Sequence, residues 1–187
     1  MTSTNQGIWP PYQAFYISSM QFNSQSAVRS IARVSAVFEK LPSQPTLEDI
    51  KALPSQQILN ELQNVILQGA ALARYFWPVR TGHEDRAEHL KQAFSVTGDS
   101  PLYDRDLRNA IEHFDERLDK YLGLGLVGYI FPEFVGYRPI DDGVPAHFFR
   151  AYFIDTGVFR LLDEEYSIEP LANEIIRLHE KLKLISS

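Results

Sequence analysis

Proline residues divide the chain, up to about residue 122, into segments whose apolar residues recur at helical spacing. The segment after Pro54 and Ser55 shows this spacing most clearly. Its main apolar stripe consists of Ile58, Leu62, Val65, Gly69, Leu72 and Phe76, with Leu59, Ile66, Ala70 and Ala73 beside it. An apolar face this wide is typical of a helix buried among other helices. The segment therefore predicts the central helix of a mainly α-helical protein.

Similar spacing predicts a helix before this one. It runs up to Phe38 and ends before Pro42 and Pro45, because proline cannot continue a helix. Its apolar face carries Ala27, Ile31, Val34, Phe38 and Leu41. Thr46-Leu47-Glu48-Asp49 then predicts a capping box at the start of a short helix, with Asp where Glu or Gln is usual.

Two more helices are expected before the composition of the chain changes. One spans about 84–96, and the other spans about 102–122 between the capping pair Ser100-Pro101 and Gly123. Helices joined by short connections predict an antiparallel four-helix bundle over residues 1–123.

Residues 124–187 differ in composition from the predicted bundle. Two β-type runs, 147–154 and 158–162, are separated by Asp155-Thr156-Gly157 and predict a β-hairpin. Glu169-Pro170 then opens an amphipathic helix with Leu171, Ile175, Leu178 and Leu182 on one face. The expected fold class is mainly α: a four-helix bundle with an appended β-hairpin and C-terminal helix packed on it. We expect the many aromatic residues between 129 and 153 to pack the strands or form a protein interface.

Composition restricts the classes of function. The formal net charge is -6, which disfavours broad binding to nucleic acid because such binding needs Lys and Arg to replace phosphate counterions. There is no cysteine, so a disulfide, a thiolate metal site and a cysteine nucleophile are all excluded. Met1 to Gln6 lack a basic start and an apolar run of signal-peptide length, and no membrane span is expected. We expect a cytoplasmic protein.

The segment from Asp106 to Phe114 contains the strongest candidate site. It places Arg108, Asn109 and His113 on the helix expected over 102–122. The apolar stripe of that helix is Leu107, Ile111, Phe114 and Leu118. Asn109 and His113 fall roughly opposite this stripe, and Arg108 lies on its flank. Two interpretations are open: polar residues on a solvated face, with an ion pair from Asp104 to Arg108, or a site that acts across an interface between subunits.

Arg108-Asn109-Ala110-Ile111-Glu112-His113 resembles the R-N-x-x-x-H motif of the HEPN superfamily, a group of small helical proteins of which many cut RNA without a metal. The resemblance implies that Arg108 and His113 are a catalytic pair and that Asn109 orients them. It also implies a homodimer in which two copies of the motif share one cleft, with RNA as substrate. An antitoxin or another protein partner and a role as a toxin or defence effector are further implications. Asp115 stands where toxin members often have Tyr, so control by modification of that Tyr is not expected.

The chemistry of these side chains suits RNA cleavage. The 2′-hydroxyl of RNA needs a base, the leaving 5′-oxygen needs an acid, and the phosphorane needs a cation. His titrates near neutral pH, and Arg carries a planar fork that matches phosphate oxygens. We expect neither a metal nor a cofactor. The alternative function is a non-catalytic helical interaction or dimerisation module.

Four other patterns are interpreted as structural. Gly123-Leu124-Gly125-Leu126-Val127-Gly128 matches a dinucleotide motif by letter, but it follows a helix and predicts a helix end and turn. The acidic cluster from His83 to His89 fits a solvated helix start, and Asp141-Asp142 fits a turn before Gly143. Arg29 and Arg33 are expected at the surface.

Overall fold

The computed structural model describes residues 10–186. The expectation about the first six residues therefore lies outside the described part of the chain. Two compact units divide the chain. Of the described residues, the helical unit contains 10–29, 65–105 and 170–186, and the sheet unit contains 30–64 and 106–169.

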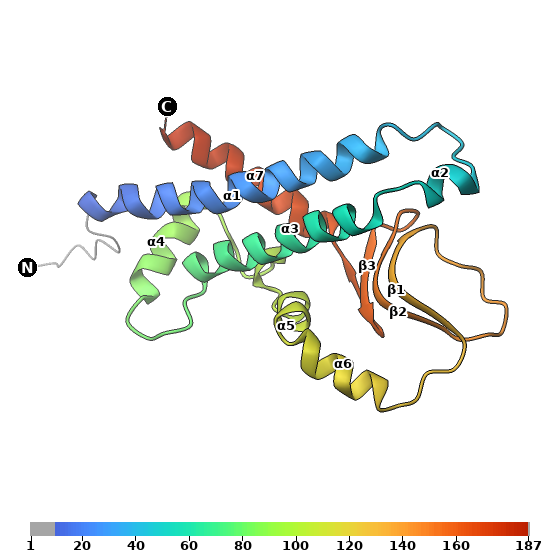
Figure 1. The fold of residues 1–187 in the computed structure, drawn as a ribbon. Coiled ribbons are helices and arrows are strands. Elements are labelled where there is room, and N and C mark those ends of the chain that lie inside the picture. The colour runs from blue at the N-terminus through green and yellow to red at the C-terminus, as the bar shows by residue number, and fades with distance from the viewer. Residues whose placement is uncertain (1–9, 187) are drawn as a thin grey trace, which may run out of the picture. The chain divides into compact units, whose positions relative to one another are not determined.

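Seven helices and one short 3-10 turn lie in the described residues (Figure 1). The helices are α1 (Pro10–Phe38), α2 (Leu47–Lys51), α3 (Ser55–Phe76), α4 (Glu84–Phe94), α5 (Asp106–Glu112), α6 (Phe114–Leu122) and α7 (Glu169–Ser186). The 3-10 turn is Pro101–Tyr103. Parts of α1 and α3 belong to each unit. The expected end of α1 at Phe38 and the expected helix after Pro54 are confirmed.

The capping box that the sequence predicts before α2 is also present. Thr46 Oγ1 accepts a hydrogen bond from Asp49 N at 3.2 Å, and the Asp49 carboxylate accepts one from Thr46 N at 2.8 Å. Asp therefore replaces the usual Glu or Gln in this motif.

The core of the helical unit lies between parts of α1, α3, α4 and α7. Its large, fully buried side chains include Met20, Leu72, Phe76, Leu90 and Phe94. Gly69 allows α7 a close approach, because a Cβ there would lie 3.1 Å from Leu171 Cδ1. Over the described residues, no helix is long and apolar enough to cross a membrane.

Two hydrogen bonds fix α7 to α4 in the helical unit. Arg177 Nη1 and Lys181 Nζ both donate to Phe94 O, at 2.9 and 3.0 Å. These two cations satisfy the last turn of α4, where backbone carbonyls have no partner within the helix.

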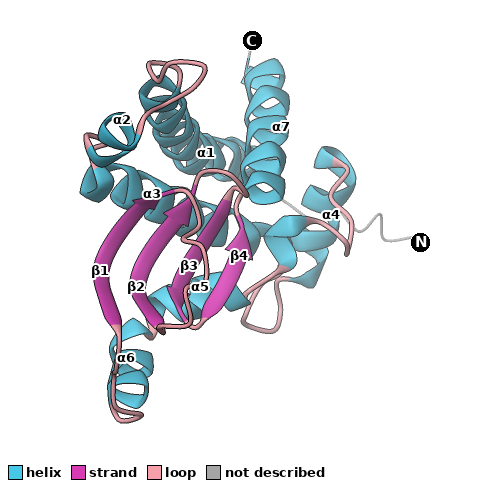
Figure 2. Ribbon diagram, turned by 90° about the vertical axis from the view of Figure 1, so that its right-hand side faces the viewer, coloured by secondary structure: helices cyan, strands magenta, loops and turns pink. Residues whose placement is uncertain are grey.

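The sheet unit contains four strands in the order β1-β2-β3-β4 (Figure 2). They are β1 (Tyr129–Gly136), β2 (Ala146–Phe153), β3 (Val158–Leu162) and β4 (Glu164–Ser167). β1 and β2 are parallel, with Tyr129 opposite Ala146 and Gly136 opposite Phe153. The other two pairs are antiparallel. Two parallel strands need a connection that runs back from the end of one to the start of the other. Here residues 137–145 form this connection, which we call the return loop, and it crosses in front of the sheet in Figure 2.

The prediction of an antiparallel four-helix bundle over residues 1–123 is wrong. The segment expected as its fourth helix is divided into the 3-10 turn, α5 and α6. α6 packs on the sheet, where the Tyr121 ring meets the rings of His147 and Phe149 at 5.8 and 6.4 Å. Apolar spacing shows that one face of a helix is buried, but it does not show whether helices or strands bury it.

The prediction of an isolated β-hairpin is also wrong. The two expected strands pair as β2 and β3, but β1 and β4 extend them to a mixed sheet. Pro132 lies within β1, and proline in a run of residues weakens the sequence signal for a strand. β4 has only four residues, and Glu164 and Glu165 make it polar. The C-terminal helix is present as α7.

Candidate functional site

The candidate motif lies across the junction of α5 and α6. Arg108 and Asn109 belong to α5, and His113 falls between the two helices with φ -114° and ψ 32°, outside the helical region. Helical hydrogen bonds continue around it, since His113 N donates to Asn109 O at 3.0 Å and Arg117 N to His113 O at 3.2 Å. The expected single helix is therefore two helices, drawn as separate coils in Figure 1.

Arg108 is held by side chains of its own helix. Its Nη2 and Nε donate to Asn109 Oδ1 at 2.7 and 3.2 Å, and its Nε lies 3.6 Å from Glu112 Oε2. The Arg108 side chain is only 17% exposed. Two hydrogen bonds to one oxygen fix the plane of the guanidinium, so Asn109 orients Arg108 within one protein chain.

His113 is the exposed member of the motif. Its side chain is 59% exposed, and its Nδ1 lies 3.7 Å from Glu116 Oε1. It precedes α6 as the N-cap residue, but its side chain makes no capping hydrogen bond. The imidazole can therefore meet a solute from outside the chain. The Leu107 side chain, which the sequence places on the apolar stripe, lies outside the described side chains.

The sheet brings a further cation to α6 that sequence reasoning missed. The Arg150 guanidinium of β2 lies 4.1 Å from the centre of the Phe114 ring, and Phe114 directly follows His113. No motif or spacing connects residues 114 and 150. Only the packing of β2 against α6 makes them neighbours.

Arg117 and Tyr121 attach the rest of α6 to the sheet. Arg117 forms an ion pair with Glu164 of β4, which raises the pKa of Arg117. Hydrogen bonds from Tyr166 and from Arg117 lower the pKa of Glu164. Tyr121 OH and His147 Nδ1 are 2.7 Å apart, and His147 Nε2 lies 3.1 Å from Val127 O. A neutral imidazole satisfies both contacts when Nε2 carries the proton and donates to Val127, while Nδ1 accepts from Tyr121. These contacts fix the helix that begins after His113.

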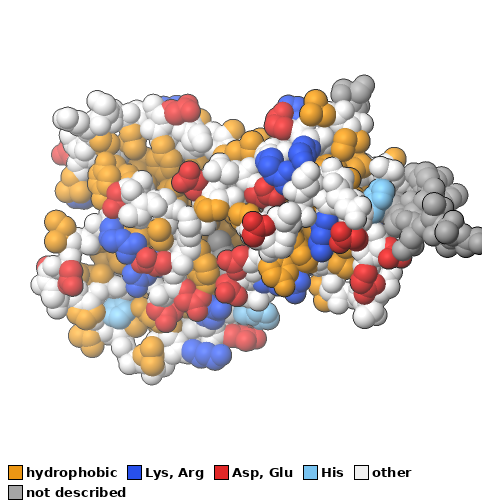
Figure 3. Space-filling view, turned by 180° about the vertical axis from the view of Figure 1, so that it is seen from behind, with side chains coloured by type: hydrophobic (Ala, Val, Ile, Leu, Met, Phe, Trp, Pro, Cys, Tyr) orange, Lys and Arg blue, Asp and Glu red, His pale blue; other side chains and the backbone are white. Residues whose placement is uncertain are grey.

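The surface is mixed in charge. Figure 3 shows Asp and Glu side chains close to Lys and Arg over one face of the molecule. Arg33, expected at the surface, is 62% exposed and pairs with Glu61 at 2.9 Å. Among the described residues, no group of three or more His, Asp or Glu is arranged to hold a metal ion.

The two turn interpretations are confirmed. Gly123 is the C-cap of α6, and Gly125 and Gly128 have positive φ angles of 75° and 122°, so the glycine pattern ends a helix. In the return loop, Asp141 Oδ1 accepts from Gly143 N at 2.9 Å and Asp142 Oδ1 from Val144 N at 3.0 Å. These are turn contacts of the kind that Asp forms with the backbone two residues ahead.

Comparisons with protein-family models, with curated proteins and with solved structures found no match to this chain.

Proposed function

We propose that the protein is a metal-independent endoribonuclease in which Arg108 and His113 act on the RNA phosphate. The observation that carries this proposal is the division of roles at the junction of α5 and α6. Asn109 holds the Arg108 guanidinium by two hydrogen bonds, while the His113 imidazole is exposed. Cleavage of RNA by its own 2′-hydroxyl requires a cation, a base and an acid, and one chain offers a fixed cation and one accessible titratable group.

In the proposed reaction, one His113 takes the proton of the 2′-hydroxyl as its oxygen attacks phosphorus. Arg108 stabilises the negative charge that grows on the phosphate oxygens. The bond between phosphorus and the 5′-oxygen breaks, and the leaving oxygen receives a proton from a second imidazole. The products are a 2′,3′-cyclic phosphate and a 5′-hydroxyl, so the protons and electron pairs balance without an added reactant.

The second imidazole would come from a second copy of the chain. One chain offers one His at this motif, whereas a two-fold pair of chains offers two. A homodimer with both α5–α6 junctions in one cleft would therefore supply the base and the acid. By resemblance to HEPN proteins, a toxin or defence role with an antitoxin partner belongs to the same proposal.

The test is cleavage of a mixed-sequence RNA in EDTA by the full chain. We expect His113→Ala and Arg108→Ala each to lower the rate about 100-fold or more, because each removes a group that acts in the transition state. His83→Ala is a matched control, since His83 is also an N-cap residue with no side-chain capping bond, at the start of α4. Cleavage by both motif variants at the parent rate would contradict the proposal.

A second candidate function is a non-catalytic dimerisation module. Pairing within the chain favours it, because Arg108 lies 3.6 Å from Glu112 and His113 lies 3.7 Å from Glu116, so both groups already have acidic neighbours. In this case RNA is not cut, and the motif variants instead change the molar mass of the protein in solution.

A further inference from the structure

Hydrogen bonds fix the two ends of the return loop, one at each end of the sheet. At one end, Tyr129 N donates to Pro145 O at 2.9 Å, and at the other, Arg138 N donates to Asp155 Oδ1 at 3.1 Å. The bonds that Asp141 and Asp142 make within the loop shape its last residues. The loop is therefore an anchored arch over one face of the sheet.

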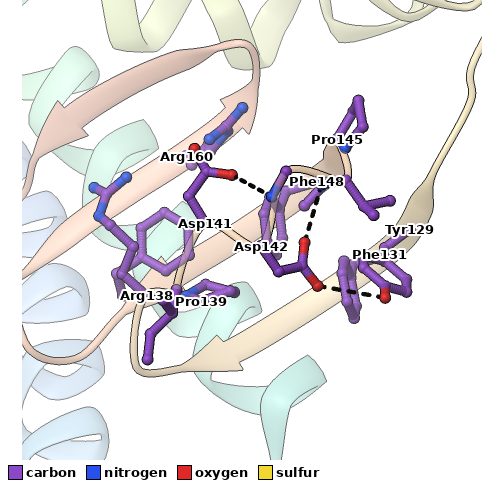
Figure 4. Close-up of a pocket in the computed structure, with 14 residues that line it drawn as sticks. Tyr129, Phe131, Arg138, Pro139, Asp141, Asp142, Pro145, Phe148 and Arg160 are labelled. Atoms are coloured by element: carbon purple, nitrogen blue, oxygen red, sulfur yellow. Dashed lines mark hydrogen bonds between the residues drawn. The ribbon is translucent and has the colours of Figure 1, made fainter.

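A pocket lies between this arch and the sheet (Figure 4). Its volume is about 760 Å³, which is in the range of small-molecule sites. Its floor is aromatic. Phe131 and Phe148 stack with ring centres 5.0 Å apart and planes at 11°, and Phe148 meets Phe153 edge to face at 5.4 Å. Phe148 and Phe153 are buried, whereas Tyr129 is 50% exposed and Phe131 is half-buried. The ring surface open to a ligand therefore belongs to Tyr129 and Phe131.

Two arginines stand over the buried rings. The guanidinium of Arg138 lies 4.4 Å from the centre of the Phe153 ring, and that of Arg160 lies 5.3 Å from the centre of the Phe148 ring. Glu165 does not itself line the pocket, but its carboxylate accepts hydrogen bonds from both arginines. The distances are 2.7 and 2.9 Å to Arg138 and 3.5 Å to Arg160. A guanidinium has five N–H groups, so the bonds to Glu165 leave donors on each arginine for an anion.

Acceptors on the loop complete the pocket. The Asp142 carboxylate lies 3.5 Å from Tyr129 OH, and Asp141 and Asp142 both line the pocket in Figure 4. A carboxylate offers about four lone-pair positions, so each can accept from a ligand hydroxyl or amino group as well as from the backbone. The pocket thus combines a flat aromatic surface, two cations and two acceptors.

We propose that this pocket binds a nucleoside monophosphate. The planar base would stack on Tyr129 and Phe131, the phosphate would bind Arg138 and Arg160, and amino or ribose hydroxyl groups would donate to Asp141 or Asp142. This proposal does not rest on the proposed ribonuclease activity, because the pocket uses no residue of α5 or α6.

The experiment is calorimetric titration of the full chain with AMP, adenosine and inorganic phosphate. We expect AMP to bind with a Kd below about 1 mM, and the other two compounds to bind at least about tenfold more weakly, because each lacks one half of the recognised group. Arg138→Gln should weaken AMP binding about tenfold or more by removing a charged donor.

Two further variants separate binding from folding. Ile140→Glu adds a negative charge to the arch at a side chain that is 92% exposed, so it should weaken AMP binding without disturbing the fold. Arg117→Gln is the matched control. Arg117 forms an ion pair with Glu164, just as Arg138 forms one with Glu165, but Arg117 lies on α6 and does not line the pocket. Arg117→Gln should therefore leave AMP binding unchanged. No binding of AMP up to about 10 mM would overturn the proposal. So would equal binding of phosphate alone, or AMP binding that neither Arg138→Gln nor Ile140→Glu weakens.

Discussion

Gly128 allows the two chain segments at the start of the parallel pair to approach closely. Its φ is +122°, and a Cβ added there would lie 2.1 Å from Pro145 O. The neighbouring bond from Tyr129 N to Pro145 O closes the return loop at this point. A side chain at residue 128 would thus separate the atoms that anchor the loop.

We predict that Gly128→Ala lowers the free energy of unfolding by more than about 2 kcal/mol, because backbone strain and a steric clash add together. Gly143→Ala should cost only about 1 kcal/mol, since its φ is +83° but nothing lies within 4 Å of the added Cβ. Urea unfolding of the parent protein and of the two variants measures both losses of stability. Equal stability of the two variants would contradict the role given to Pro145 O.

At the scale of elements, β4 connects two ion pairs on opposite faces of the sheet. Glu164 pairs with Arg117, and the next residue, Glu165, pairs with Arg138, as the alternation of side chains along a strand requires. The Arg138 guanidinium lowers the pKa of Glu165. A carboxyl group with a lowered pKa in the folded state stabilises the fold at neutral pH and loses this contribution as the pH falls through that pKa.

Glu165→Gln should therefore reduce stability at pH 7 and make progressively less difference below about pH 4. The loss at pH 7 should be below about 1 kcal/mol, because the pair is more than a third exposed and water screens it. Urea unfolding of parent and variant at several pH values measures the difference, with Glu39→Gln as an exposed control. A difference that does not depend on pH would show that the ion pair is not its source.

The elements that the sequence predicted are those with strong local signals. α1 ends before the prolines that predict its end, α3 follows Pro54 with the predicted apolar spacing, and Thr46 caps α2. The break at His113 has no proline or glycine to mark it, so the sequence carries no local signal for it. β1 and its parallel pairing with β2 depend on residues distant in sequence, which spacing alone does not reveal. Likewise, the motif from Arg108 to His113 was visible in the sequence, whereas its neighbour Arg150 was not.

At the scale of the whole molecule, the proposed reaction requires two copies of the chain. We predict that the specific rate of RNA cleavage in EDTA falls on dilution, in step with the dimer fraction measured by light scattering. The control is dilution into a constant excess of inert carrier protein, which prevents loss on surfaces. A rate per chain that stays constant when only monomer is present would contradict the shared cleft.

The helical unit joins α1 to α7, which lie far apart in the sequence. Gln21 Nε2 donates to Leu182 O at 3.1 Å, and Ser24 Oγ lies 3.0 Å from His179 Nδ1, across separations of 161 and 155 residues. On the ribosome, α1 therefore emerges long before its partner α7 has been made. The four strands, by contrast, pair in the order in which they are synthesised. The sheet can form before α7 has been made, but the apolar face around Met20 must stay shielded, by a chaperone or by transient contacts, until α7 is available to cover it.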